Sequence, residues 1–100
     1  MKLITKEIEK KLSKYPLRSQ DGKGKEAVVI CKFFLGNFTW YVLEGNKLSN
    51  GDWELYGIVD NCGIREYGYF MLNELMKLRK WQVLKVERDM YFSPCNVGSL

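Results

Sequence analysis

The sequence predicts an α+β fold, in which an antiparallel sheet of four to five strands packs against an N-terminal helix and a second helix. Within residues 65–80 the apolar side chains first alternate, as in a strand, and then recur at helical spacing. Upstream of this switch, apolar stretches are separated by short Gly- and Asn-containing turns, which is the pattern of a strand meander. The predicted element order is therefore α-β-β-β-β-α-β.

The chain length favours one domain. One hundred residues bury roughly two-thirds of the surface of the unfolded chain, which is enough for an apolar core without disulfides. We expect the domain to span residues 1–94, and residues 95–100 to form a flexible tail after Pro94. No apolar run approaches the ~18 residues that cross a bilayer, and the N-terminus lacks the pattern of a signal peptide. We therefore expect a cytoplasmic protein without membrane contact.

The first element is a predicted helix from Thr5 to about Lys14. Thr5 is a suitable N-cap, and the helix stops before Pro16 because the residue preceding a proline is pushed out of the α region. One apolar stripe runs along this helix and consists of Ile4, Ile8, Leu12 and Tyr15. Residues 17–25 then form a polar, Gly-containing loop.

The predicted meander begins at residues 26–35, which are apolar on both faces and therefore belong in the middle of a sheet or under a helix. Gly36 and Asn37 make a tight turn, so residues 38–44 are expected to be the antiparallel partner. Further along the chain, the pattern predicts a loop at 45–51, a strand at 52–59, a turn at 60–63 and a strand at 66–71.

The second helix is expected from residue 72 to about residue 80, with basic residues in its last turn, where they suit the helix dipole. A final strand is expected at Val83–Phe92. The charged run Glu87, Arg88 and Asp89 interrupts its apolar residues. Such charges either pair locally or cap a turn, or they form a polar site on a rigid element.

The reactive side chains give no catalytic signature. The three cysteines, Cys31, Cys62 and Cys95, are odd in number and widely spaced, and the chain has no histidine. We therefore expect no disulfide framework, no metal and no cofactor, and we interpret Cys31 as a core residue. Without histidine the commonest general base is missing. An enzyme would need carboxylates to converge, and the candidates are Glu44, Glu66, Glu87 and Asp89.

The positive charge is concentrated near the N-terminus. Residues 1–25 contain eight Lys and Arg against three acidic residues, whereas residues 26–100 contain eight against nine. This asymmetry is either the solvated face of an ordinary helix or a surface that contacts phosphates. The candidate nucleic-acid-binding residues are Lys2, Lys6, Lys10, Lys14, Arg18, Lys23 and Lys25.

Several short motifs recur in a distinctive order along the chain. They are Phe33-Phe34, Thr39-Trp40-Tyr41 with Glu44, residues 55–59 (LYGIV), residues 66–70 (EYGYF) with residues 73–75 (NEL), and residues 87–92 (ERDMYF) with Pro94. In this order and spacing the chain resembles the family of domains of unknown function numbered 2958, over Leu3 to Pro94. The resemblance implies a gene carried on plasmids, conjugative elements or phage.

One residue departs from the family pattern. Such proteins usually place a Ser or Thr cap before the second helix, whereas this chain has Met71. The exchange weakens the start of the helix by about 1 kcal/mol.

Two classes of function remain open. The first is an interaction protein that binds a partner protein through exposed aromatic residues, because aromatics are the usual anchors of an interface. Small mobile-element proteins often act as stoichiometric inhibitors of host enzymes, including defence nucleases. The candidate partner-binding residues are Trp40, Tyr41, Trp53, Tyr56, Tyr67, Tyr69, Glu87, Arg88 and Asp89.

The second class is a nucleic-acid-binding protein, in which the same aromatics stack on bases and the N-terminal lysines neutralise phosphates. A phosphate-driven complex weakens steeply as salt rises, whereas an aromatic protein interface does not. We expect a monomer, or a homodimer with twofold symmetry through the free aromatic face.

Overall fold

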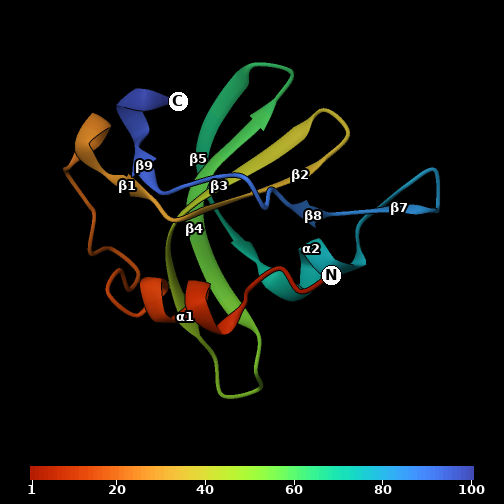
Figure 1. The fold of residues 1–100 in the computed structure, drawn as a ribbon, viewed down its shortest axis with the longest axis horizontal. Coiled ribbons are helices and arrows are strands. Elements are labelled where there is room, and N and C mark those ends of the chain that lie inside the picture. The colour runs from red at the N-terminus through yellow and green to blue at the C-terminus, as the bar shows by residue number, and fades with distance from the viewer.

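The structure, a computed structural model, describes residues 1–100 and centres on a five-stranded antiparallel sheet (Figure 1). The strands lie side by side in the order β5-β4-β3-β2-β8. The predicted α+β class is confirmed, and the element order roughly matches the prediction. The sheet strands are β2 (Cys31–Leu35), β3 (Phe38–Lys47), β4 (Trp53–Asn61), β5 (Ile64–Met71) and β8 (Glu87–Arg88).

Two helices and several short elements surround this sheet. Neither helix has the length and apolar content that crossing a bilayer requires. The surrounding elements are α1 (Lys6–Leu12), η1 (Gly24–Glu26), β1 (Val28–Val29), α2 (Leu72–Lys77), β6 (Arg79–Lys80), β7 (Leu84–Lys85), β9 (Cys95–Asn96) and η2 (Val97–Ser99).

The main core lies between one face of the sheet and the helices. Alternate residues of the central strands point to this side, and Phe33, Val42 and Leu55 are completely buried there. Leu12 of α1 and Leu75 of α2 pack against them, so both helices cover the same face. The predicted apolar stripe of the first helix is confirmed, because its residues all belong to this core or pack against it.

The opposite face of the sheet is covered only in part. Ala27, Val29, Leu43 and Ile58 form a smaller core there, closed by side chains from the end of the chain. In that closure β9 pairs with β1. The segment after Pro94, which the sequence predicts to be a frayed tail, is therefore hydrogen-bonded and packed.

Both helix starts have an acceptor, but from different sources. At α1 the predicted N-cap is confirmed, because the Thr5 hydroxyl accepts from the Ile8 amide at 3.2 Å. At α2 the residue in the cap position, Met71, offers no side-chain acceptor. Instead, the buried Asp52 carboxylate accepts from the Asn73 amide at 2.9 Å, so a distant residue supplies the cap.

The strand boundaries differ from the sequence pattern in the middle of the chain. β3 runs on through Lys47 and pairs with β4, where a loop was expected. Gly45 is buried there, and a Cβ at this position would lie 2.7 Å from the Leu55 side chain. Glycine in this strand therefore permits close packing and does not mark a loop.

The predicted last strand, Val83–Phe92, is wrong. Trp81 and Gln82 both take positive φ angles, of 53° and 60°, and reverse the chain between β6 and β7. Only Glu87 and Arg88 join the main sheet, opposite Phe34 and Phe33 of β2. α2 also ends earlier than expected, at Lys77, because the following residues extend into β6.

Candidate functional site

Four tyrosines lie on the sheet face opposite the helices, and together they form what we call the tyrosine face: Tyr41, Tyr56, Tyr67 and Tyr69. Tyr56 lies opposite Tyr69, and Ile58 lies between Tyr41 and Tyr67 across β3, β4 and β5. Residues directly opposite each other in antiparallel strands point to the same side of the sheet. Ile58 belongs to the smaller core, which places this row on the side away from α1 and α2.

Three of the four rings form one aromatic cluster. The ring centroids of Tyr56 and Tyr69 are 4.8 Å apart, and those of Tyr56 and Tyr67 are 6.0 Å apart in a stacked arrangement. Tyr67 is 53% exposed and Tyr69 is 59% exposed. Because each ring is held by its neighbour, the cluster presents ordered aromatic surface to solvent with few free torsions.

Tyr41 is flanked by cations. The Arg65 guanidinium lies 5.6 Å and the Lys32 ammonium 5.8 Å from its ring centroid, within cation–π range. Arg65 also forms an ion pair with Asp60, at 2.8 Å. This hydrogen bond lowers the pKa of Asp60, assisted by the Gly63 amide, and raises the pKa of Arg65. These contacts fix the charges at this end of the tyrosine face.

A buried carboxylate lies at the other end of the face. Glu44 is 1% exposed, and its two oxygens accept from the backbone amides of Arg18 and Gln20, at 2.6 and 2.8 Å. No Lys or Arg forms an ion pair with it. The Gln20 side chain in turn binds Val28 and Leu43 backbone groups, which fastens the loop to the sheet.

A cavity of about 360 Å³ opens beside Glu44. Partial burial, followed by the Glu44 carboxylate and the neighbouring tyrosines, raises the pKa of Tyr56. Two carboxylate residues, Asp21 and Glu44, thus line the cavity beside this ring, although the protein carries a net charge of +4. The cavity is lined by Gln20, Asp21, Gly22, Gly24, Ala27, Leu43, Glu44, Tyr56 and Tyr67.

The expectation that the two candidate tryptophans lie on the exposed face is wrong. Trp40 is 6% exposed and Trp53 is 5% exposed, and both belong to the core under the helices. Tyr41 is the chain neighbour of Trp40, so the alternation of a strand sends the two side chains to opposite faces. The helices cover the tryptophan side, which the sequence alone did not specify.

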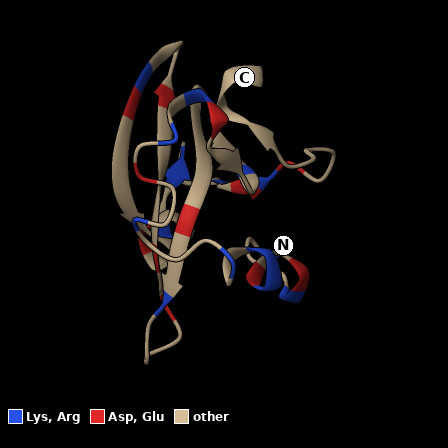
Figure 2. Cartoon of the chain, turned by 90° about the vertical axis from the view of Figure 1, so that its left-hand side faces the viewer, with Lys and Arg blue, Asp and Glu red and all other residues tan.

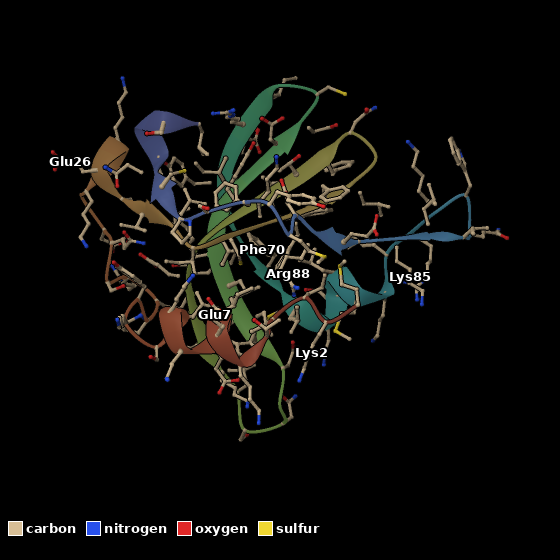
Figure 3. The ribbon with its side chains drawn as sticks, in the orientation of Figure 1. Lys2, Glu7, Glu26, Phe70, Lys85 and Arg88 are labelled. Atoms are coloured by element: carbon tan, nitrogen blue, oxygen red, sulfur yellow. The ribbon has the colours of Figure 1, made fainter.

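The charged run of β8 contacts the rest of the protein. The Arg88 guanidinium donates to the Lys2 and Leu3 carbonyls, and Figure 3 places Arg88 near the N-terminal segment. Asp89 forms an ion pair with Lys32 at 3.6 Å and accepts from a backbone amide in the following turn. Glu87 is exposed and forms no ion pair. Two of these three charged side chains therefore have partners within the chain.

The basic N-terminal residues do not form a surface of one sign. Figure 2 shows acidic and basic residues together on α1, where Lys11 pairs with Glu7. Arg18 pairs with Asp21 in the following loop. The seven candidates are spread over the N-terminal segment, α1, the loop and η1. Their positive charges are therefore partly offset by carboxylates of the same region.

The four candidate carboxylates do not converge. Glu66 lies on β5 and Glu87 on β8, which are opposite edges of the five-stranded sheet. With strands about 4.8 Å apart, these edges are separated by roughly 19 Å. Glu44 lies between them but is buried, and Asp89 is paired with Lys32. No group of three or more Cys, Asp or Glu side chains is arranged to hold a metal ion.

The cysteines are unpaired. Cys31 is buried in the main core, as predicted, and burial raises the pKa of its thiol to about 12. Cys62 is exposed in the β4–β5 turn, and Cys95 is partly buried in β9.

Sequence reasoning missed two parts of the site. Gln20 and Asp21 lie beside the tyrosine face because the Glu44 carboxylate holds their loop against the sheet. Nothing in the local sequence of this loop predicts that contact. Trp81 is 77% exposed at the tip of the β6–β7 hairpin. Its turn contains no Gly, Asn or Asp, so the usual hairpin signal was missing.

The comparisons with known proteins identify a family but no activity. No curated protein and no solved structure matches the chain. One family model does match, described as "Protein of unknown function (DUF2958)", and it covers residues 3–99. The matched region includes both helices, every strand of the main sheet and β9. The chain belongs to the DUF2958 family, as its motifs predicted.

Proposed function

We propose that this protein is a non-enzymatic interaction protein that binds a partner protein through the tyrosine face. The observation that carries this proposal is the cluster of Tyr56, Tyr67 and Tyr69, because it is both ordered and solvent-exposed. Exposed tyrosines of this kind are enriched among the residues that dominate binding energy. They supply a large contact area and lose little conformational entropy on binding.

The charge of the face indicates which side chain the partner contributes. Glu44 lines a cavity together with Tyr56 and Tyr67, and no cation of this chain forms an ion pair with it. An Arg or Lys of the partner that enters this cavity would lie beside two tyrosine rings and close to a buried carboxylate. We therefore propose a partner that inserts a cationic side chain beside Glu44.

The biological setting follows from the family resemblance. Proteins of this kind are expected on plasmids, conjugative elements and phage, and we propose that this one acts in the host cytoplasm as a stoichiometric inhibitor of a host enzyme. Binding without turnover is consistent with carboxylates that do not converge. The proposal requires a complex of fixed stoichiometry.

The experiment that tests this proposal is a pull-down from host lysate with three forms of the purified protein. The forms are wild type, the double variant Tyr67→Ala/Tyr69→Ala, and the control Tyr91→Ala, which removes a 97% exposed tyrosine outside the tyrosine face. Each is tested with and without nuclease, at low and high salt. We expect one protein to be retained by wild type and the control, and lost by the double variant.

The retained protein is then purified and its affinity for the three forms measured by calorimetry. Truncation of one anchor tyrosine is expected to cost about 2 kcal/mol, or roughly 30-fold in Kd. Equal binding of the double variant would refute the tyrosine face as the interface. Recovery of nucleic acid alone, lost at high salt, would favour the nucleic-acid alternative over a protein partner.

A further inference from the structure

A second site lies on the other side of the sheet from the tyrosine face. It is a hollow of about 540 Å³ between the β2–β3 turn, the end of β4 and the start of the β6–β7 hairpin. The hollow contains no carboxylate. Its lining consists of Leu35, Asn37, Phe38, Trp40, Asn61, Leu78, Arg79 and Lys80.

The hollow offers both surfaces that a nucleobase needs. Phe38 stacks on the buried Trp40, with ring centroids 5.8 Å apart and planes 19° apart, and Phe38 itself is 43% exposed. A planar ring can therefore stack on a Phe38 ring that Trp40 holds in place. Asn37 and Asn61 add amides, which both donate and accept hydrogen bonds and so match the edges of bases.

The surroundings of the hollow are positively charged. Residues 77–85 contain four cations, Lys77, Arg79, Lys80 and Lys85, and no acidic residue. The Arg79 guanidinium donates to the Met76 and Leu78 carbonyls, which fixes its charge at the end of α2. This density of one sign fits a polyanion.

The hairpin adds an exposed indole beside these charges. In Figure 1 the hairpin projects from the body of the protein, and Figure 3 marks Lys85 on it. Trp81 and Gln82 at its tip both have positive φ, which is costly for residues other than Gly or Asn. The Lys80 ammonium lies 4.7 Å from the Trp81 ring. A tryptophan is thus held in solvent in a strained turn.

We propose that this hollow and hairpin bind single-stranded nucleic acid. One unpaired base enters the hollow and stacks on Phe38, Trp81 stacks on a neighbouring base, and the hairpin cations contact phosphates. A single strand is required because bases within a duplex are stacked and their edges paired. This site shares no residue with the tyrosine face, and it lies apart from the lysines of α1.

The test measures binding of fluorescently labelled 12-nucleotide DNA and RNA strands by anisotropy, between 50 and 200 mM salt. Trp81→Ala is expected to weaken binding about tenfold, and Trp81→Phe to retain most of it, because stacking on one ring is lost or kept. Phe38→Leu is expected to cost about as much, since it removes the ring in the hollow but keeps its apolar volume. Tyr91→Ala is the control for an exposed aromatic outside the site.

Charge and fluorescence provide independent readouts. Lys80→Gln is expected to reduce the slope of log affinity against log salt by about 0.7, the value for one phosphate contact on a single strand. Lys47→Gln, on β3, is the matched control.

Trp81 is the only exposed tryptophan, because Trp40 and Trp53 are buried. Oligonucleotide should therefore quench the emission of wild type and not that of Trp81→Ala.

The proposal is overturned if neither strand binds at 50 mM salt, or if Trp81→Ala and Phe38→Leu bind like wild type. Equally tight binding of a duplex of the same sequence, or of a free mononucleotide, would also overturn it. Binding to vesicles containing phosphatidylglycerol without binding to the strands would assign the hairpin to an anionic membrane instead. Thermal unfolding of each variant verifies that it is folded.

Discussion

Replacement of Asp52 by alanine tests whether a residue 20 positions before the start of α2 serves as its cap. The Asp52 carboxylate is 8% exposed and its Oδ1 accepts from two backbone amides, Trp53 at 2.7 Å and Asn73 at 2.9 Å. Asp52→Ala leaves both donors without this acceptor. Loss of a helix cap costs about 1 kcal/mol, and a buried amide without a partner costs about 1 to 2 kcal/mol more.

We therefore expect Asp52→Ala to lower the free energy of unfolding by about 2 to 3 kcal/mol. Urea unfolding followed by circular dichroism measures this as a midpoint shift of about 1 to 2 M, for a slope of roughly 1.5 kcal/mol per M. Asp52→Asn keeps a capping oxygen and should lose less than about 1 kcal/mol.

A substitution at Met71, the N-cap residue of α2, tests whether a local cap can replace the Asp52 carboxylate. Its backbone is extended, as at an ordinary N-cap, so a serine there can offer an oxygen to the first turn of α2. Met71→Ser should recover part of the stability lost in Asp52→Ala, and should add little to the wild-type protein. A loss of under 0.5 kcal/mol for Asp52→Ala, or equal effects of Met71→Ser in both backgrounds, would refute the cap.

Three further predictions follow from particular contacts. A Cβ at Gly57 would lie 1.9 Å from a backbone oxygen of β3, whereas a Cβ at Gly68 would meet nothing within 4 Å. In urea unfolding, Gly57→Ala should therefore lower the free energy of unfolding by more than about 3 kcal/mol, and Gly68→Ala by less than about 0.5 kcal/mol. In the native protein an alkylating reagent should modify exposed Cys62 quickly, and buried Cys31, with its thiol pKa near 12, only after unfolding. The hydrogen bond from Arg65 holds the pKa of the Asp60 carboxyl in the folded protein below its ordinary value of 3.8. The ionised Asp60 therefore stabilises the folded protein above pH 3.8, and this stabilisation is lost as the pH falls through the lower pKa of the folded state. Asp60→Asn should flatten the dependence of the unfolding free energy on pH in that range.

The local features that the sequence predicted correctly are those set by neighbouring residues. The first helix begins at Thr5 because a hydroxyl there reaches the amide three residues on. The β2–β3 hairpin turns at Gly36, whose φ of 58° is readily available only to glycine. Strand alternation and the buried position of Cys31 also follow from local pattern. These features require no knowledge of what packs against them.

The sequence-based prediction failed where the structure of a segment depends on which distant segment packs against it. Alternation showed that Trp40 and Tyr41 point to opposite faces of β3, but not which face the helices would cover. Trp40 is buried because Leu12 and Leu75 come to its side. The residues after Pro94 are ordered because β1 offers them a pairing edge. Neither outcome has a signal within the segment concerned.

The sequence by itself determined the class of fold, the meander and the family, because periodicity and turn residues act over a few positions. Only the tertiary structure decided which aromatics face solvent, that Glu44 gathers the loop of Gln20 beside them, and that Asp52 caps α2. It also turned the expected last strand into a hairpin with Trp81 at its tip. The physical reason is that burial and long-range hydrogen bonds depend on the partner surface, which no local pattern encodes.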